Sequence, residues 1–424
     1  MMAAKAIAER PVAGLRQNAG TRPPIRVLYS FPHKLGAGRI CTTAWEQVKG
    51  LAEAGADVHV FTGAISRPLP PGIKTRTTLA WGRLRVPYRV IGDMRACAVH
   101  DYIVAKRLSR MPEQFDIIHA WPLGALRTLE AATRLAIPTV LERPNAHTRF
   151  AYEVVQKESE RIGVPLPPNH EHAYNAHVLR VEEEEYRRAF RLLCPSEFTA
   201  DTFLERGFRS EQLVRHFYGV DREIYHPDSR LGNSARPFTA LFVGVCAVRK
   251  GLHYALDAWL RSPAAQTGQF LIAGEFLPAY EKKLAPLLSH PSVRVLGHRN
   301  DVPELMRVSD ILLLPTIEEG FGLVCTEAMV SGCVPVVSSA CTELCKHMEN
   351  ALVHSVGDVA ALAAHITLLH DQRELLEKLR AAGIACAPQI TWATAGSKLL
   401  DVYRSVLQDH TRREQSHSEE TVDR

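Results

Sequence analysis

Short apolar runs alternate with longer amphipathic segments along most of this chain, and this alternation limits the fold more than any other feature. The pattern starts with IRVLYSF at 25–31, continues with TTAWEQVKGLAEAG at 42–55, and returns to an apolar run at 56–63. It repeats at 115–121 and 137–142, with ALRTLEAATRLA between them. Such short apolar runs are typical of buried parallel strands, and the stretches between them of covering helices. The sequence therefore predicts an α/β protein with doubly wound parallel sheets.

The pattern breaks at 218–238, a stretch rich in turn-forming residues, and then resumes. The later apolar runs lie at 238–244, 269–275, 293–298, 310–315 and 334–339. A chain of 424 residues is also too long for one typical hydrophobic core. We expect two similar domains, residues 25–218 and residues 237–390. Because ligands of such sheets bind beyond the carboxyl ends of the strands, the cleft between the domains is the expected site.

The two ends of the chain lack this alternation. Residues 1–24 are basic but have no continuous apolar core, so they fail as a signal peptide, and we expect a flexible lead. Residues 393–410 predict one terminal amphipathic helix, and the polar residues 411–424 predict a flexible tail. No apolar run is long enough to span a bilayer.

The composition of the chain limits the kinds of molecule that it is expected to bind. A net charge of +5 permits an anionic substrate or loose association with an anionic membrane surface. No stripe of Lys and Arg interleaved with aromatics is present, so nucleic acid is not an expected partner. The nine cysteines are scattered, and only Cys341 and Cys345 are close, which indicates buried free thiols in a reducing compartment rather than a zinc site.

The acidic segment RVEEEEYRRAF at 180–190 is predicted to be the solvated face of a helix. Glu183 with Arg187 and Glu184 with Arg188 have the i,i+4 spacing of helical ion pairs.

The segment EEGFGLVCTE at 318–327 carries the most specific chemistry. It follows the apolar run DILLLP and precedes a helix expected to begin near Leu323, so it forms a strand–loop–helix turn. Gly320 and Gly322 let the backbone bend and approach a ligand closely, and a helix N-terminus attracts anions. Glu319 and Glu327 could then reach different ends of one elongated, hydroxyl-rich ligand. The alternative is a helix-capping acid and a surface glutamate.

Two further strand–helix turns have related features. Arg249 and Lys250 stand just before Gly251 and a predicted helix, where two cations suit a diphosphate and a solvated basic loop is the alternative. Gly36 and Gly38 follow the first apolar run and also permit close backbone approach. A lone G-x-G is weak evidence, and it is not the dinucleotide fingerprint.

Together these motifs resemble the family 4 retaining glycosyltransferases, which act on nucleotide sugars. The resemblance covers most of residues 25–408, and EGFGLVCTE matches the family's E-x₇-E motif. It implies the GT-B fold, in which two Rossmann-like domains face each other across a cleft and the C-terminal helix crosses back to the first domain. It implies no cofactor beyond the donor, and leaves the oligomeric state open.

The resemblance also implies roles for individual residues. Glu319 would bind the hydroxyls of the donor sugar and Lys250 the diphosphate, with both taking part in catalysis. Glu327 would bind the ribose. The further donor contacts implied are Gly36, Gly38, Arg249, Gly297, His298, Arg299, Gly320, Phe321, Gly322 and Leu323. In this group Gly36 and Gly38 would line the phosphates, and residues 297–299 would border the nucleobase.

The match to the family leaves a choice between two histidines and lacks one arginine. His147 is the better match to the family's active-site histidine, and His119 in DIIHAW is the competing candidate. Val245 stands where many members carry an arginine, so Arg249 could supply that charge. We also expect Arg249 to point away from Lys250, by strand-like alternation.

The sequence therefore predicts a retaining glycosyltransferase that moves a hexose from a nucleotide diphosphate sugar to a glycan or glycolipid. No Asp-x-Asp occurs, so no metal is expected. The resemblance implies acceptor contacts in the loops at 64–95 and 146–177 of the first domain. We expect a cytoplasmic protein that could associate with the inner membrane face. The alternatives are a non-hydrolysing nucleotide-sugar epimerase of the same fold and a catalytically inactive sugar-nucleotide-binding protein.

Overall fold

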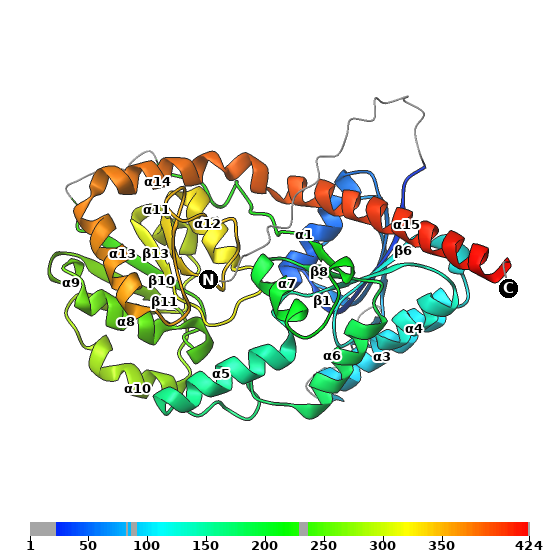
Figure 1. Ribbon diagram of the computed structural model, residues 1–424, viewed down its shortest axis with the longest axis horizontal. Helices are drawn as coiled ribbons and strands as arrows, with labels where there is room; N and C mark the ends of the chain where they lie inside the picture. The colour runs from blue at the N-terminus through cyan, green and yellow to red at the C-terminus, as the bar shows by residue number, and fades with distance from the viewer. Residues whose placement is uncertain (1–22, 82–83, 86–90, 229–235, 423–424) are drawn as a thin grey trace.

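Two parallel sheets organise the molecule, as the computed structural model shows for residues 23–81, 84–85, 91–228 and 236–422 (Figure 1). The first has seven strands in the order β3-β2-β1-β6-β7-β8-β9. Its strands are β1 (Arg26–Leu35), β2 (Asp57–Ile65), β3 (Lys74–Thr77), β6 (Ile117–Ala120), β7 (Thr139–Glu142), β8 (Arg191–Cys194) and β9 (Leu213–Arg215). A separate antiparallel pair joins β4 (Ala80–Trp81) and β5 (Leu84–Arg85).

The helices that follow these strands are α1 (Ile40–Glu53), α3 (Asp93–Leu108), α4 (Leu126–Arg134), α5 (Thr148–Ile162), α6 (Ala176–Arg188) and α7 (Glu197–Leu204). The core strand residues are fully buried and apolar, as at Val27, Ile117 and Val140. Strand order reverses between β1 and β6, which places a topological switch point there.

The second sheet has six parallel strands in the order β12-β11-β10-β13-β14-β15. They are β10 (Thr239–Val243), β11 (Gln269–Ala273), β12 (Val293–Gly297), β13 (Ile311–Leu314), β14 (Val334–Ser338) and β15 (Leu352–His354). Its helices are α8 (Leu252–Arg261), α9 (Ala264–Thr267), α10 (Pro278–Leu288), α11 (Val302–Val308), α12 (Leu323–Ser331), α13 (Val359–Asp371) and α14 (Arg373–Ala385). The switch point lies between β10 and β13, so the loops after these two strands meet at one edge.

The last helix, α15 (Trp392–Val422), crosses back onto the first domain (Figure 1). Gly50 of α1 and Gly396 of α15 approach so closely that a Cβ at either position would collide with the other backbone. The fold class and the returning helix predicted from the sequence are therefore confirmed. Among the described residues, no helix is both long enough and apolar enough to cross a membrane.

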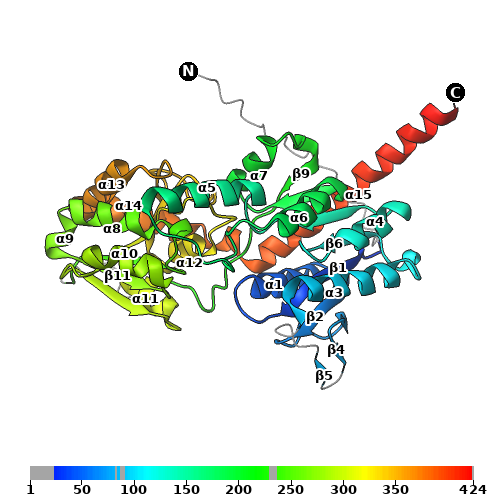
Figure 2. The ribbon, with the colours of Figure 1, turned by 90° about the horizontal axis from the view of Figure 1, so that it is seen from below.

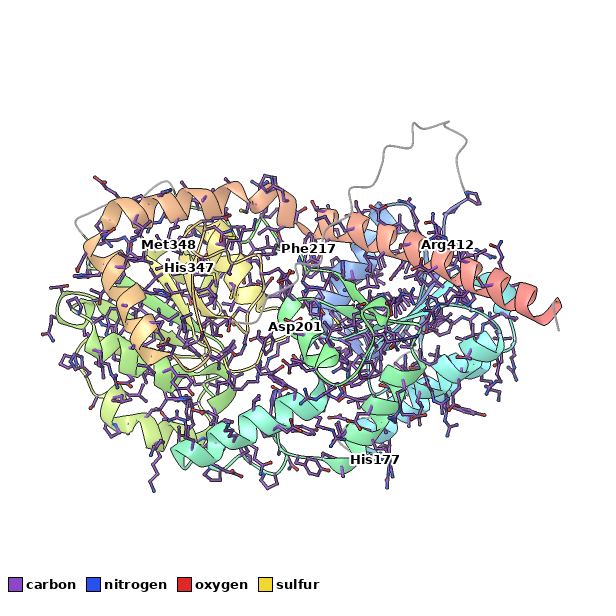
Figure 3. The ribbon with its side chains drawn as sticks, viewed as in Figure 1. His177, Asp201, Phe217, His347, Met348 and Arg412 are labelled. Atoms are coloured by element: carbon purple, nitrogen blue, oxygen red, sulfur yellow. The ribbon has the colours of Figure 1, made fainter. Side chains whose placement is uncertain are left out.

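The helix at the C-terminus is longer than predicted. The sequence predicted its end at residue 410 and a flexible tail after it, but helical structure continues to Val422. Ion pairs one helical turn apart support this extension, because His410 lies 3.7 Å from Glu414 and Arg412 lies 3.9 Å from Asp409. Arg412 is labelled in Figure 3 beyond the contact with α1, and its side chain is largely exposed. The predicted lead 1–24 falls almost wholly outside the described residues.

Helix α6 is only partly a solvated face. The Glu184–Arg188 pair forms at 2.6 Å, but Glu183 pairs with Arg149 instead of Arg187. Glu182 and Glu185 are buried on the other side of the same helix. Four successive glutamates cover all sides of a helix, since each residue turns the helix by about 100°, so two of them necessarily face the protein.

Helix α5 belongs to the first half of the chain but packs along the second domain, beside α8 (Figures 1 and 2). Glu158 of α5 accepts hydrogen bonds from His253 and Tyr254 of α8, at 2.8 and 2.7 Å. Val164, just beyond α5, is part of the second domain's hydrophobic core. The two domains are therefore joined by two crossing helices, α5 in one direction and α15 in the other.

Candidate active site

The loops after β10 and β13 are joined to each other at the switch point of the second sheet. The backbone N–H of Ile317 donates to the carbonyl of Arg249 at 2.8 Å. Gly251 has φ +67° and lies directly against the Pro315 carbonyl, where a Cβ would collide. Only glycine fits both the left-handed backbone and the close approach. These contacts fix the basic loop beside the acidic loop.

Two cations converge on one carboxylate in this cluster. Lys250 forms an ion pair with Oε2 of Glu319, and Nη1 of Arg249 lies 3.5 Å from Oε1 of the same group. The Arg249 guanidinium also donates to the backbone carbonyl of Glu318 at 3.0 Å. The prediction that Arg249 points away from Lys250 is wrong, because residues 248–250 form a turn of 3-10 helix rather than a strand.

The charges in this cluster decide the ionisation of Glu319. Burial on its own raises the pKa of a carboxyl, but the adjacent charges of Lys250 and Arg249 outweigh it and lower the pKa of Glu319 to about 2. Glu319 is therefore ionised at neutral pH. A carboxylate of this kind accepts hydrogen bonds from hydroxyl groups.

Gly320 is fixed by contacts from the first domain. Its carbonyl accepts hydrogen bonds from the hydroxyls of Ser196 and Thr199, the latter at 3.0 Å. A Cβ at this position would collide with the carbonyl oxygen of Pro144. The glycine is needed here because the two domains touch at this loop.

The Phe321 side chain is part of the packing rather than of an open site. It is 2% exposed and lies edge-to-face on Tyr218, with ring centroids 5.3 Å apart. Gly322 follows with φ +77° at the N-terminus of α12, which begins at Leu323 as predicted. The implied donor contact of Phe321 would therefore come from its backbone.

Glu327 lies on α12 and is half-buried. Burial raises its pKa to about 7, although a hydrogen bond from the Tyr225 hydroxyl opposes the shift. Tyr225 belongs to the stretch YGVDREIYHP between the domains, and the sequence reasoning did not single it out. Glu319 and Glu327 thus have different partners, a cationic pair for one and a phenol for the other.

The glycines of the first domain lie on the loop between β1 and α1, at the switch point of the first sheet. Gly36 has φ +77° and packs against Arg67 and Trp45. Gly38 has φ +93° and is exposed, with open space where a Cβ would stand. The backbone conformation explains both glycines, and their donor-phosphate role stays a prediction.

The residues implied for the nucleobase, 297–299, begin at the last residue of β12, the edge strand of the second sheet. Gly297 has φ +66°, and Arg299 pairs with Asp301 in solvent. His298 is exposed. Val245, at the position of the family's arginine, is 37% exposed in the loop after β10. These positions are open to a ligand, but no contact joins residues 297–299 to the Glu319 cluster.

His147 caps the N-terminus of α5, where its Nδ1 accepts from the backbone N–H of Arg149 at 3.2 Å. The ring is 3% exposed and packs against Tyr186 and Phe203. Burial and nearby arginines lower its pKa to about 3. These contacts join the ring to neighbours within the first domain and not to Lys250 or Glu319, so its role as the active-site histidine stays a prediction.

His119, the competing candidate, is fully buried. Its Nδ1 lies 2.6 Å from the Tyr403 hydroxyl of α15, and its Nε2 lies 3.3 Å from Glu142. It therefore joins the first sheet to the returning helix, in agreement with a structural role.

A third histidine, which the sequence reasoning missed, reaches the acidic loop. His172 Nε2 lies 3.2 Å from Oε2 of Glu318, and the backbone N–H of Ala146 donates to Oε1 of the same carboxylate at 3.1 Å. Glu318 is fully buried. The two adjacent glutamates in EEGFG were the sequence signal for such a partner, because a second carboxylate that is buried needs hydrogen-bonding or charged groups around it.

Comparison with known proteins defines the class. The fold is GT-B: the structure of WaaG, a glycosyltransferase involved in lipopolysaccharide biosynthesis, aligns with TM-score 0.63 over 89% of this chain and 99% of that one, at 17% identity. Anabaena Alr3699/HepE in complex with UDP aligns with TM-score 0.62 over 90% of this chain and all of that one, at 18% identity.

The sequence comparisons give the family. Residues 41–224 match Glycosyltransferase Family 4, and residues 237–372 match Glycosyl transferases group 1. The D-inositol 3-phosphate glycosyltransferase of Streptomyces griseus is 34% identical over 88% of this chain and 85% of its own. The chain belongs to the family 4 (group 1) glycosyltransferases, and the predicted family and enzyme class are confirmed.

Proposed function

We propose that this glycosyltransferase moves a hexose, with retention of configuration, from a nucleoside diphosphate sugar to a hydroxyl of a glycan or glycolipid. A uridine nucleotide is the first candidate for the donor, because the structural relative HepE is described in complex with UDP. Retention is carried over from the family, and the absence of a recognisable nucleophile–acid carboxylate pair in the sequence fits a front-face displacement rather than a covalent glycosyl-enzyme.

The ion pair between Lys250 and Glu319 carries this proposal. The two side chains neutralise each other at the edge of the sheet where ligands of this fold bind. A nucleotide sugar offers a partner to each, since its diphosphate attracts the ammonium and its hydroxyls donate to the carboxylate. When a nucleotide sugar binds, the ion pair is replaced by contacts of each side chain with the ligand. Neither charged group is then left without a partner.

The charged residues and the loop backbone of this site each have a role in transfer. Lys250 and Arg249 stabilise the negative charge that develops on the leaving diphosphate. Glu319 and the backbone of Gly320 to Gly322 hold the sugar, and Glu327 holds the ribose. The leaving diphosphate itself accepts the acceptor's proton on the same face, so no protein nucleophile is needed.

We propose that transfer needs no metal ion. Two cations beside Glu319 already supply the charge that a diphosphate requires. Among the residues that the structure describes, no group of three or more His, Cys, Asp or Glu is arranged to hold a metal.

The relatives indicate which acceptors to test. Sequence relatives carry the name D-inositol 3-phosphate glycosyltransferase, and the structural relative WaaG is described as acting in lipopolysaccharide biosynthesis. We therefore propose tests with a phosphorylated polyol beside glycans and glycolipids. If the acceptor is a glycolipid, we propose that the enzyme acts in the cytoplasm, at the inner face of the membrane.

A two-stage experiment tests the proposal. Thermal shift with UDP-, GDP- and ADP-sugars identifies the donor, because a ligand that binds only the folded state raises the melting temperature. The identified donor is then incubated with an acceptor panel, and NMR reads the anomeric configuration of the product. A free sugar nucleotide of changed configuration would instead show an epimerase. Donor binding without hydrolysis or transfer would show an inactive binding protein.

A further inference from the structure

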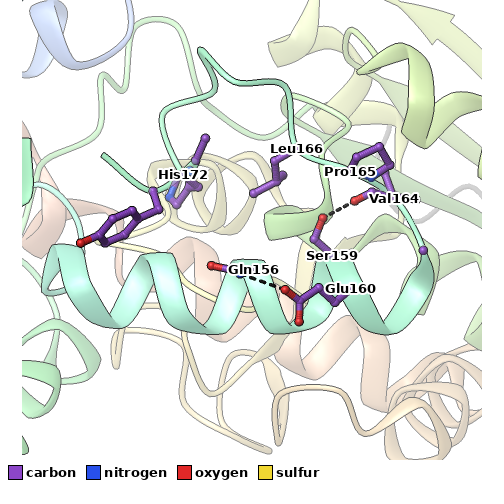
Figure 4. Close-up of a pocket in the computed structure, with 10 residues that line it drawn as sticks. Gln156, Ser159, Glu160, Val164, Pro165, Leu166 and His172 are labelled. Carbon is purple, nitrogen blue, oxygen red and sulfur yellow. Dashed lines mark hydrogen bonds between the residues drawn. The ribbon is translucent and has the colours of Figure 1, made fainter. Parts of the chain in front are cut away.

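A pocket of about 440 Å³ lies between helix α5 and the loop that follows it (Figure 4). Gln156, Ser159 and Glu160 line it from the helix, and Leu166 and His172 line it from the loop. The volume is within the range of small-molecule sites, about 300–1,000 Å³.

The polar groups on the helix side of this pocket already have partners. Ser159 donates its hydroxyl hydrogen to the Val164 carbonyl, and Gln156 donates to Glu160 at 2.9 Å (Figure 4). On the loop wall, Pro165, Leu166 and Ala173 present apolar groups beside the rings of His172 and Tyr174. A surface whose polar groups are satisfied by one another favours an apolar occupant, because a polar one would gain few new hydrogen bonds.

One buried polar atom in the lining is different. His172 is 4% exposed, and its Nδ1 has no hydrogen-bond partner among the described residues, the nearest acid being Glu171 at 3.6 Å. Its Nε2 faces the Glu318 carboxylate, whose pKa is lowered by His172 and Arg249 against the effect of burial. In the neutral ring the hydrogen is therefore assigned to Nε2, which leaves a lone pair on Nδ1. A ligand hydroxyl can donate to that lone pair.

The pocket is fixed relative to the donor side of the molecule. Glu318, which His172 contacts, directly precedes Glu319 in the loop that also holds Lys250. On the other face of α5, Glu158 is bonded to His253 of α8. Both the loop wall and the helix wall are thus attached to the second domain.

We propose that this pocket is an acceptor subsite that takes the apolar group of a hydroxyl-bearing acceptor. An acceptor hydroxyl donates to Nδ1 of His172, and the apolar group lies along Leu166 and Ala173. His172 is a positioning residue in this scheme. The inference rests on the proposed function, and it adds that the acceptor is amphiphilic rather than a free sugar.

Monomeric alkyl glycosides test the idea without the natural acceptor. Binding of n-octyl and methyl β-D-glucoside to the full-length protein, saturated with UDP, is measured by calorimetry below the micellar concentration. Burial of most of an octyl chain predicts at least about tenfold tighter binding of the octyl compound. Equal affinity for the two compounds would overturn the proposal.

Matched variants locate the binding. Ala173→Phe fills the pocket, whereas Asn169→Phe adds the same ring at an exposed position of the same loop that does not line it. We expect octyl glucoside binding to be lost only in Ala173→Phe. If octyl glucoside binds both variants as it binds the unaltered protein, the pocket is not the site.

His172→Gln tests the positioning role. The glutamine amide can replace Nε2 as the donor to Glu318, but it offers no group at the place of Nδ1. We expect several-fold weaker octyl glucoside binding with UDP affinity unchanged, and unchanged binding of both would refute the role of Nδ1. Because nucleotide binding is measured separately, failure of UDP, GDP and ADP alike to bind would count against the proposed function, whereas failure of glucoside binding alone counts against this subsite.

Discussion

At the scale of single residues, Glu319 and Glu327 occupy the two ends of one motif but have different environments. Glu319 is ionised beside two cations, and Glu327 is half-buried against Tyr225. We expect Glu319→Ala to abolish transfer because the proposed function places it on the reacting sugar, and Glu327→Ala mainly to weaken donor binding, because the same proposal places it on the ribose. Rate and donor affinity, measured separately, check this. Equal and small effects of the two changes would contradict the assignment.

Lys250 and Arg249 share the carboxylate of Glu319, but Lys250 makes the closer contact. A charge-assisted bond to phosphate contributes roughly 1.5–3 kcal/mol, so Lys250→Ala should lower the rate by about one to two orders of magnitude. Arg249→Ala should cost less in transfer. A larger loss in Arg249→Ala would mean that it replaces the arginine missing at Val245. A gain of activity in Val245→Arg would show that the phosphate site lacks a cation.

The raised pKa of Glu327, about 7, predicts a dependence of stability on pH. The folded state holds this proton more tightly than the unfolded chain, whose glutamate pKa is about 4.3. Stability from this group is therefore complete at low pH and is lost as the pH rises through 7, by on the order of 1–3 kcal/mol. Glu327→Gln keeps an acceptor for Tyr225 and should flatten this slope in urea unfolding between pH 5 and 8. An unchanged slope would contradict the shift.

At the scale of elements, the loop between β13 and α12 is held by its neighbours in space. Gly320 lies against the Pro144 carbonyl, so Gly320→Ala forces the loop or the first domain to move. We expect loss of donor binding together with a lower melting temperature. Gly55→Ala, just after α1, is the control, since its Cβ meets open space and its cost is only the strain of a positive φ, about 1 kcal/mol. Thermal unfolding and UDP calorimetry on both variants measure these effects. Small and similar changes in melting temperature and UDP affinity in the two variants would contradict a tight contact at Gly320.

At the scale of the whole molecule, the loops after β10 and β13 of the second domain bring two cations together at the carboxylate of Glu319. If these groups neutralise the diphosphate, transfer should be insensitive to chelators. We expect the same rate in EDTA as in added Mg²⁺ or Mn²⁺. Activity that is lost in EDTA and restored by either ion would contradict metal independence.

The sequence by itself determined the alternation of strands and helices, the strand–helix turns that carry Lys250 and Glu319, and the start of α12. These features follow from hydrophobic periodicity and from the positions of glycines. Both are local signals, because each depends on residues only a few positions apart in the chain. The tertiary structure alone decided that α5 packs on the second domain, that Glu182 and Glu185 are buried, and that Arg249 turns toward Glu319. It also joined His172 to Glu318, 146 residues away in the chain. No local pattern encodes such a pair, because it exists only where the packing of two domains brings distant side chains together.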